Sequence, residues 1–232
     1  MTPRRSYGDP CGIARALDLV GERWALLVVR ELVLGPKRFT DLRAGLPHVS
    51  SEVLAQRLRE LESAGVLARR TLRPPNAVRV YELTPWGQEL EPVLLALGRF
   101  GSQAPMPPDV PALGVDAMVL ALPTLFDPEA AGELAATVAL VVDEQAFGVR
   151  VSDGRLEVTR GDAEPADAAI TTDPATLAAV LWHGRRPAEA RRAGALRVGG
   201  DRRVAERFLR LFPRPPASTT MQARSPRTSA GA

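Results

Sequence analysis

The chain has 232 residues, of which 45% are hydrophobic and 25% are charged. These proportions are close to the average for folded globular proteins and argue against a wholly disordered chain. The length exceeds that of one typical domain, so we expect two domains. The sequence contains no apolar run of about 18 residues, and its start, MTPRRSYGDPCG, lacks the apolar stretch of a signal peptide. We therefore expect a cytoplasmic protein with no membrane partner.

The residue types that most often carry catalysis or bind metals are scarce. Cys11 is the only cysteine, and His48 and His183 are the only histidines. A single cysteine cannot form an intramolecular disulfide or a cysteine metal cluster. The sequence also contains no phosphate-binding loop and no arrangement of nucleophile, acid and base. It therefore predicts a protein that is not an enzyme and that carries no metal or cofactor.

Charge is distributed unevenly along the chain. The formal net charge is +4 over residues 1–108, −4 over residues 109–212 and +3 over residues 213–232. A basic first part followed by an acidic second part is typical of a DNA-binding module fused to a different kind of domain.

Proline content indicates where the domains divide. QAPMPPDVP, residues 103–111, contains four prolines, too many for a helix or a central strand. We interpret it as a linker between domains at residues 1–102 and 112–212. Residues 213–232 lack apolar periodicity and are predicted to form a disordered tail. The expected fold class is α+β.

The first domain begins with a series of predicted helices. Residues 11–21 read as a helix ending at Gly21, and residues 24–32 are apolar nearly all round, as in a buried central helix. Apolar residues at 39, 42 and 46 predict a short helix. A turn then leads into a longer helix over residues 51–65, capped by Ser50 or Ser51. The order is helix, turn, helix.

Strand patterns follow this helical part. Residues 66–72 and 77–84 are rich in β-branched residues and are joined by RPPN, which predicts a hairpin. Residues 85–100 carry apolar side chains at helical spacing and predict one more helix. A hairpin directly after a helix-turn-helix indicates a winged helix.

The longer helix has two contrasting faces. Leu54, Leu58 and Leu61 fall on one side, whereas Gln56 and Arg59 fall on the other. Such a helix, placed after a tight turn and before a basic hairpin, has the arrangement needed to enter a DNA major groove. Because glutamine can pair with adenine and arginine with guanine, Gln56 and Arg59 are the predicted base-reading residues. A plain solvated face is the simpler alternative for any single helix of this kind.

Basic residues gather around this helix, with nine Arg or Lys against four Asp or Glu between positions 37 and 81. Such clustering suits contacts with DNA phosphates. Arg57, on the flank of the helix, could instead bond within the protein. The predicted DNA-binding residues are Lys37, Arg38, Ser50, Ser51, Glu52, Gln56, Arg57, Arg59, Arg73 and Arg79.

Several spaced blocks together resemble one known family. The blocks are CGIARALDLVGERWALLVVREL, GPKRFTDLRAGLPHVSSEVLAQRLRELESAGVL and VRVYELTPWGQELEPVL. They are similar to the HxlR-type branch of the MarR-like winged-helix regulators, over residues 9 to about 101. The resemblance implies a homodimer that binds a two-fold DNA operator. Helices with no evident partner suggest the dimer interface, for which the candidates are Cys11, Leu90, Leu94, Leu97 and Phe100.

Cys11 has a second candidate role. Members of the resembled family can sense oxidants through a cysteine at this position, so Cys11 is a candidate redox switch. The simpler interpretation is a small apolar residue on a helix. With no second cysteine, oxidation would link two chains or stop at a sulfenic acid or mixed disulfide.

The second domain combines predicted strands and helices. Residues 134–143, 146–154 and 155–161 predict a strand meander with an Asp-Gly turn. The segments AAITTDPATLAAVL and ALRVGGDRRVAERFLRLF resemble the C-terminal part of the sterol carrier protein-like fold. That resemblance implies an apolar tunnel, and hence an apolar small-molecule ligand. Apolar side chains such as Leu177 and Phe208 are more often plain core than the wall of a ligand site.

Together these features predict a dimeric, sequence-specific DNA-binding regulator, with repression as the simpler default. The alternative is a lipid or small-molecule carrier that uses the winged helix as a dimerisation scaffold. An enzyme acting through the acidic second domain is a third hypothesis, but no residue could be nominated for it. The operator, the target genes and the effector cannot be read from the sequence.

Overall fold

The computed structural model describes residues 6–72, 78–105 and 113–213. The chain divides into two compact units. The first comprises residues 1–94 together with two short pieces, 114–120 and 158–160, and the second comprises residues 95–113, 121–157 and 161–232. The first unit therefore includes residues that lie well beyond the segment predicted to form the winged helix.

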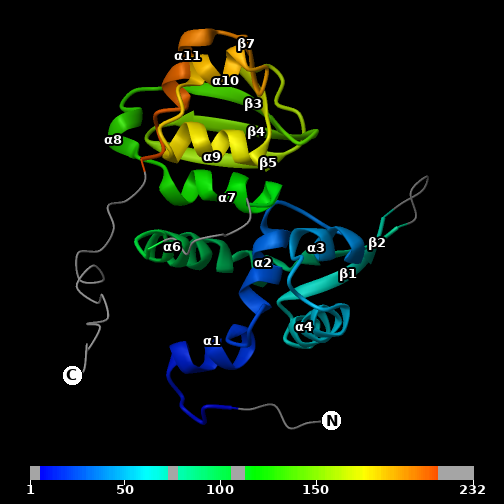
Figure 1. Cartoon of the computed structure of the whole chain (residues 1–232). Coiled ribbons are helices and arrows are strands. Elements are labelled where there is room, and N and C mark those ends of the chain that lie inside the picture. Colours follow the sequence, from blue (N-terminus) through cyan, green and yellow to red (C-terminus); the bar gives the residue numbers. More distant parts are fainter. Residues whose placement is uncertain (1–5, 73–77, 106–112, 214–232) are drawn as a thin grey trace, which may run out of the picture. The chain divides into compact units, whose positions relative to one another are not determined.

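Four helices open the first unit (Figure 1). They are α1 (Gly12–Val20), α2 (Ala25–Val33), α3 (Phe39–Gly45) and α4 (Ser51–Ser63). The four helices predicted from the sequence are thereby confirmed. Of the two proposed caps, Ser50 is the residue that caps α4, because its hydroxyl oxygen accepts a hydrogen bond from the Val53 amide at 3.3 Å.

The predicted hairpin is also present. Strands β1 (Leu67–Thr71) and β2 (Arg79–Leu83) pair antiparallel, with Leu67 opposite Leu83. The backbone of Lys37 adds a further bridge to this hairpin: its amide donates to the Tyr81 carbonyl at 2.9 Å and its carbonyl accepts from the Tyr81 amide at 2.8 Å. The hairpin tip predicted at RPPN falls in residues 73–77, outside the described part of the chain.

The prediction of one helix over residues 85–100 is wrong. The structure has a short helix, α5 (Pro85–Gln88), and then α6 (Leu90–Ser102). Pro92 explains the break, because its ring would clash with the carbonyl of residue 88 in a continuous helix and it has no amide hydrogen to donate. The Thr84 hydroxyl caps α5 by accepting from the Gly87 amide at 3.0 Å. A side chain at Gly87 would overlap the Val66 carbonyl, so this approach requires glycine.

The winged-helix core is apolar and continuous. Val28, Val29 and Leu32 of α2 are fully or almost fully buried, together with the inner face of α4. Leu90 and Leu94 of α6 are partly buried against this core. The alternation of buried and exposed positions along α4 thus follows the predicted helical periodicity.

The second unit is built on a five-stranded sheet in the order β5-β4-β3-β6-β7. The strands are β3 (Ala136–Val142), β4 (Gln145–Ser152), β5 (Arg155–Arg160), β6 (Ala168–Thr172) and β7 (Leu196–Gly200). The remaining helices are α7 (Val115–Leu125), α8 (Pro128–Ala131), α9 (Pro174–Trp182), α10 (Pro187–Arg192) and α11 (Arg202–Phe208). The sequence patterns did not predict α7 or α8. The α+β expectation holds.

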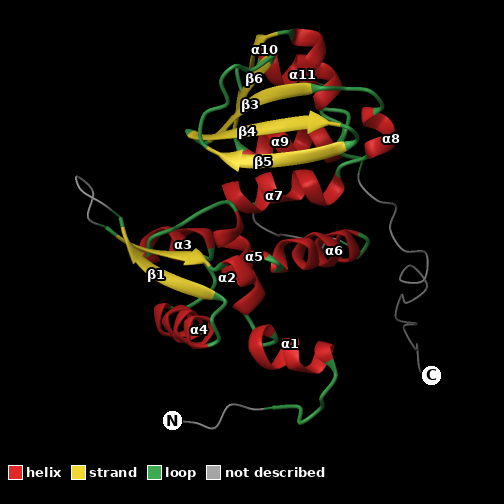
Figure 2. Cartoon of the chain, turned by 180° about the vertical axis from the view of Figure 1, so that it is seen from behind, coloured by secondary structure: helices red, strands yellow, loops and turns green. Residues whose placement is uncertain are grey.

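The predicted meander is confirmed by the neighbouring order of β3, β4 and β5. Asp153 and Gly154 both have positive φ at the turn between β4 and β5, as a tight hairpin requires. Strand β3 also pairs parallel with β6. Helix α9 lies against one face of the sheet, in front of the strands in Figure 1 and behind them in Figure 2.

The side chains considered as a ligand wall lie in the packed interior of the second unit. Leu177 and Phe208 are at most 1% exposed, and Phe208 makes an edge-to-face contact with Phe212 at 5.1 Å between ring centroids. Leu140 and Phe147 of the sheet are equally buried. These residues therefore form a core of their own for the second unit.

Most of the predicted linker and all but the first residue of the predicted tail fall in residues 106–112 and 214–232, outside the described chain. Within the ranges that the structure does describe, none of the helices combines the length and the apolar character needed to cross a membrane.

Candidate nucleic-acid interface

The helix-turn-helix is formed by α3, α4 and the segment between them. Leu46 and Val49 are buried, and the Val49 amide donates to the Leu46 carbonyl at 3.2 Å, which closes the turn. Leu54 and Leu58 of α4 are at most 1% exposed. Because the inner face of α4 is held by this core, its opposite face is turned to solvent.

The predicted base-reading residues lie on that outer face. Gln56 and Arg59 are both exposed. The Gln56 amide group donates to Glu60 Oε1 at 2.5 Å, and its carbonyl oxygen accepts from Arg59 Nη2 at 2.7 Å. Such exposed pairs stabilise a helix by only about 0.2–0.5 kcal/mol, so DNA bases could compete for both side chains.

The first turn of α4 brings together Ser50, Ser51 and Glu52. Ser50 and Glu52 are exposed, and Ser51 is half-buried. The pKa of Glu52 is lowered mainly by a backbone hydrogen bond and by one from the Ser50 hydroxyl, with a smaller contribution from the charge of Arg43. Glu52 is therefore an ionised acceptor in the first turn of α4.

Arg57 points into the protein. Its side chain is 15% exposed and forms ion pairs with Glu60 at 2.5 Å and Glu22 at 3.6 Å. Since Glu22 precedes α2, this arginine ties α4 to the preceding part of the chain. The alternative of bonding within the protein, left open by the sequence, describes Arg57 better than a DNA contact.

Several flanking arginines already have acidic partners. Arg38 binds both carboxylate oxygens of Asp41, at 2.9 and 3.1 Å. That contact raises the pKa of Arg38 and, together with the Arg38 amide, lowers the pKa of Asp41. On the hairpin, Arg69 pairs with Glu62 and Arg70 pairs with Glu82. The acidic partners therefore already balance part of the positive charge of these three arginines within the protein.

Arg43 and Arg79 differ from the paired arginines. Both are exposed, and within residues 6–72, 78–105 and 113–213 neither has an ion-pair or hydrogen-bond partner for its side chain. Arg43 lies on α3 and Arg79 on β2. The sequence placed Arg43 in the basic cluster but not among the selected contacts, because a charge pattern does not show which arginines are already paired.

Lys37 is held internally. Its ammonium group pairs with Glu31 at 2.7 Å and also with Asp116, and its side chain is only 12% exposed. With two carboxylate partners and little exposure, the Lys37 ammonium group is poorly placed to contact a phosphate. Arg73, the predicted hairpin-tip contact, lies outside the described residues.

The predicted dimer residues separate into two groups. Leu90 and Leu94 pack against the winged-helix core, so the structure gives them a partner within the chain. Leu97 is 48% exposed and Phe100 is 75% exposed. Cys11, directly before α1, is an exposed free thiol. Of the predicted dimer residues, only Leu97, Phe100 and Cys11 are exposed enough to contact another subunit.

The second unit contains a half-open cavity of about 280 Å³. Val180, Pro187 and Leu209 contribute apolar surface, whereas Arg186, Glu206 and Arg210 contribute charge. Leu177 and Phe208, which lie in the core, do not line it.

Comparison with known proteins assigns the first part of the chain. A family model described as HxlR-like helix-turn-helix matches residues 19–108. The HTH-type transcriptional regulator YvaP of Bacillus subtilis, itself uncharacterised, is 38% identical over 90 residues, which are 38% of this chain and 82% of that protein. The chain belongs to the HxlR-like helix-turn-helix family. This confirms the family resemblance drawn from the sequence.

Two further proteins are similar to this chain. An uncharacterised HTH-type transcriptional regulator of Synechocystis is 41% identical over 96 residues, or 41% of this chain and 70% of that protein. The reduced form of YodB from B. subtilis, a solved structure, is 33% identical, with a TM-score of 0.37 over 40% of this chain and 92% of that chain. The HxlR-like family model ends at residue 108, so most of the second unit lies outside it.

The second unit matches a different family model, described as Alkyl sulfatase C-terminal, over residues 105–218. A solved sec-alkyl sulfatase, PisA1, is 20% identical, with a TM-score of 0.40 over 44% of this chain and 16% of that chain. The matching model is thus not a sterol carrier model, and the sterol carrier-like identity stays a prediction.

Proposed function

We propose that this protein is a sequence-specific DNA-binding transcriptional regulator that binds a two-fold operator as a homodimer. The observation that carries the proposal is the outer face of α4, where Gln56 and Arg59 are exposed after a closed turn. Exposed Arg43 and Arg79 extend positive charge onto α3 and the hairpin. Membership of a helix-turn-helix family supports the same role.

The mechanism follows from these positions. Helix α4 would lie in the major groove, where Gln56 can bind adenine and Arg59 can bind guanine. Arg43 and Arg79 would contact phosphates and set the register of the protein on the duplex. Repression by steric exclusion of the transcription machinery is the simpler outcome, and we propose a binding role rather than a catalytic one.

The decisive experiment is selection of duplexes from a random-sequence pool by the purified full chain, followed by footprinting of the enriched sequence. We expect one enriched motif with two-fold symmetry, protected over two successive major grooves. Failure to enrich any sequence would contradict the proposal.

Arg59→Ala and Gln56→Ala should each weaken binding to the enriched duplex by about 1–3 kcal/mol and relax the preference at one base pair, because each removes a base contact. Competition binding against duplexes altered at single positions measures this loss. Arg79→Ala is the matched control, expected to weaken enriched and random duplexes alike. Equal losses on both duplexes for all three variants would refute the assigned roles.

We propose that the homodimer interface uses α1 and the outer side of α6. Ile13 and Leu17 of α1 are 73% and 42% exposed, and Val93, Leu97 and Phe100 of α6 are about half or more exposed. Large apolar side chains gathered on one helix face are typical of a surface that another subunit covers.

Replacing both Leu97 and Phe100 with glutamate should therefore convert a dimer to a monomer in sedimentation velocity at micromolar concentration, because the charges would have to be buried unpaired. Val53→Glu, at an exposed apolar position on α4, is the control and should leave the dimer intact. A double variant that sediments like the wild type would remove α6 from the proposed interface.

Two inputs to the regulator are proposed. Exposed Cys11 is accessible to oxidants and is the candidate redox switch. The second unit, whether or not it is sterol carrier-like, is the candidate site for a small-molecule effector with an apolar part. Its cavity joins an apolar lining from Val180 and Leu209 to two arginines.

A further inference from the structure

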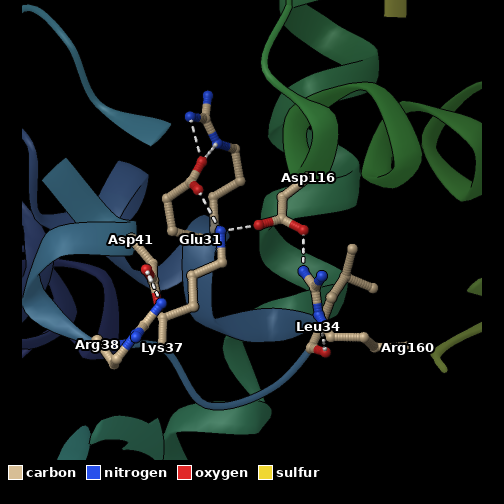
Figure 3. A network of polar contacts seen from close by, with 8 residues as sticks. Glu31, Leu34, Lys37, Arg38, Asp41, Asp116 and Arg160 are labelled. Atoms are coloured by element: carbon tan, nitrogen blue, oxygen red, sulfur yellow. Dashed lines mark hydrogen bonds and ion pairs between the residues drawn. The ribbon is translucent and has the colours of Figure 1, made fainter. Parts of the chain in front are cut away.

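A group of buried charges lies within the first unit, away from the outer face of α4. Glu31 accepts from Lys37 Nζ at 2.7 Å and from Arg30 Nη2 at 2.7 Å. Asp116 pairs with both Lys37 and Arg160. Figure 3 shows the Lys37 ammonium between the two carboxylates, and the Arg160 guanidinium at the other oxygen of Asp116. We call Glu31, Lys37, Asp116 and Arg160 the ion network.

Because much of the network lies away from solvent, each of its charges needs an opposite charge beside it. The Glu31 and Asp116 side chains are each only 3% exposed, Lys37 is 12% exposed, and Arg160, at the edge of the group, is 29% exposed. Burial lowers the pKa values of Lys37 and Arg160, and the negative charge of Glu31 opposes this effect in both. Removing one partner of such a group leaves an unpaired charge in a poorly solvated site, which is far more disruptive than removing a matched pair.

The network is attached to the elements that support the candidate reading helix. Glu31 lies on α2, which packs against α4. Lys37 lies directly before α3, and its backbone is bonded to Tyr81 of the hairpin. A side chain at Gly45, the last residue of α3, would overlap the Glu31 carboxylate, so α3 approaches this acid closely. A shift of the Glu31 or Lys37 side chain would therefore disturb α2, α3 and the hairpin.

The other two members come from far along the chain. Asp116 lies in the first turn of α7, and Arg160 is the last residue of β5. The Arg160 Nε group also donates to the Leu34 carbonyl, just after α2, at 3.3 Å. The first unit thus includes two downstream segments that bring one negative and one positive charge to the helix-turn-helix.

We propose that Asp116 and Arg160 are positioning residues for DNA recognition, which set the DNA affinity of the α3–α4 surface through Lys37 and Glu31. This inference rests on the proposed DNA-binding function. On this inference, the DNA-reading unit does not end near residue 102 but also includes residues 114–120, in and directly before α7, and residues 158–160 of β5. Helix α7 and strand β5 both continue into the second unit.

The test uses full-length protein and the duplex enriched from the random pool by the wild-type chain. Asp116→Asn keeps the side-chain shape but leaves Lys37 and Arg160 without their shared carboxylate. We expect at least a tenfold loss of affinity for the enriched duplex. The salt dependence should stay unchanged, because no phosphate contact is removed. Glu129→Gln, which removes an exposed carboxylate from α8, is the matched control and should bind like the wild type.

A double variant separates positioning from a loss of folding. Lys37→Met combined with Asp116→Asn restores the net charge of the network, so we expect it to bind the enriched duplex much more tightly than Asp116→Asn does. If circular dichroism at the assay temperature shows that Asp116→Asn alone does not fold, the double variant provides the test. Wild-type affinity for Asp116→Asn, or a double variant no better than the single one, would overturn the inference.

Lys37→Met alone distinguishes the internal role from a direct DNA contact. A salt slope reduced by about one would identify Lys37 as a phosphate contact and overturn the inference, whereas an unchanged slope with weaker binding supports it. If the wild-type chain enriches no duplex at all, the proposed function and the inference fall together. The other contrary results overturn the inference alone and leave DNA binding intact.

Discussion

Raising the salt concentration from about 50 to about 200 mM should weaken DNA binding by about 10³- to 10⁵-fold, if two subunits together neutralise about six to ten phosphates. The reason is the release of counterions from DNA when arginines replace them. Exposed Arg43 and Arg79 on each subunit are proposed to supply four of these contacts. Fluorescence anisotropy with a labelled enriched duplex, titrated at several salt concentrations, measures the slope directly.

The control for this prediction is the Arg43→Ala, Arg79→Ala double variant. The magnitude of the salt slope should fall by about one for each phosphate that an arginine no longer neutralises. Ser63→Ala, an exposed change at the end of α4, should leave the slope unaltered. Affinity that hardly responds to salt would argue strongly against DNA as the partner of this surface.

Leu58→Ala should destabilise the protein by about 2–5 kcal/mol, because it opens a cavity between α4 and the rest of the winged-helix core. Leu58 is 1% exposed and belongs to the apolar face that holds α4 in place. Urea unfolding followed by circular dichroism gives the change in free energy of unfolding. DNA binding should weaken in parallel at temperatures where the variant is partly unfolded.

Val53→Ala provides the comparison on the same helix. Val53 is 39% exposed, so its replacement leaves no cavity and should change the free energy of unfolding by no more than about 0.5 kcal/mol. If the two variants were equally stable, the inner face of α4 would not be packed as the structure shows.

Much of the winged helix could be predicted from the sequence because its signals are local. Apolar residues at 54, 58 and 61 recur at helical spacing, and Ser50 precedes them as a cap. The hairpin strands were recognised from β-branched residues. The break between α5 and α6 was missed although Pro92 marks it, because the apolar spacing over residues 85–100 outweighed a single proline.

The sequence predicts the outer face of α4 but not the ion pairs around it. Helical periodicity places Gln56 and Arg59 on the exposed face of α4, as the structure has them. Periodicity does not reveal ion pairs, because those depend on which acidic residue the fold brings nearby. Arg57, paired with Glu22 and Glu60, and Lys37, paired with Glu31 and Asp116, were therefore placed among the DNA contacts.

The sequence by itself determined the winged-helix order, the outward face of α4 and the strand meander of the second unit, since each follows from the spacing of residues close together in the chain. Only the tertiary structure decided which arginines are already paired. Only the tertiary structure shows that Asp116 and Arg160 lie in one network with Glu31 and Lys37, from which they are separated by some eighty to 130 residues of sequence. A buried charge is stable only beside an opposite charge, and that neighbour is selected by folding, not by proximity along the chain.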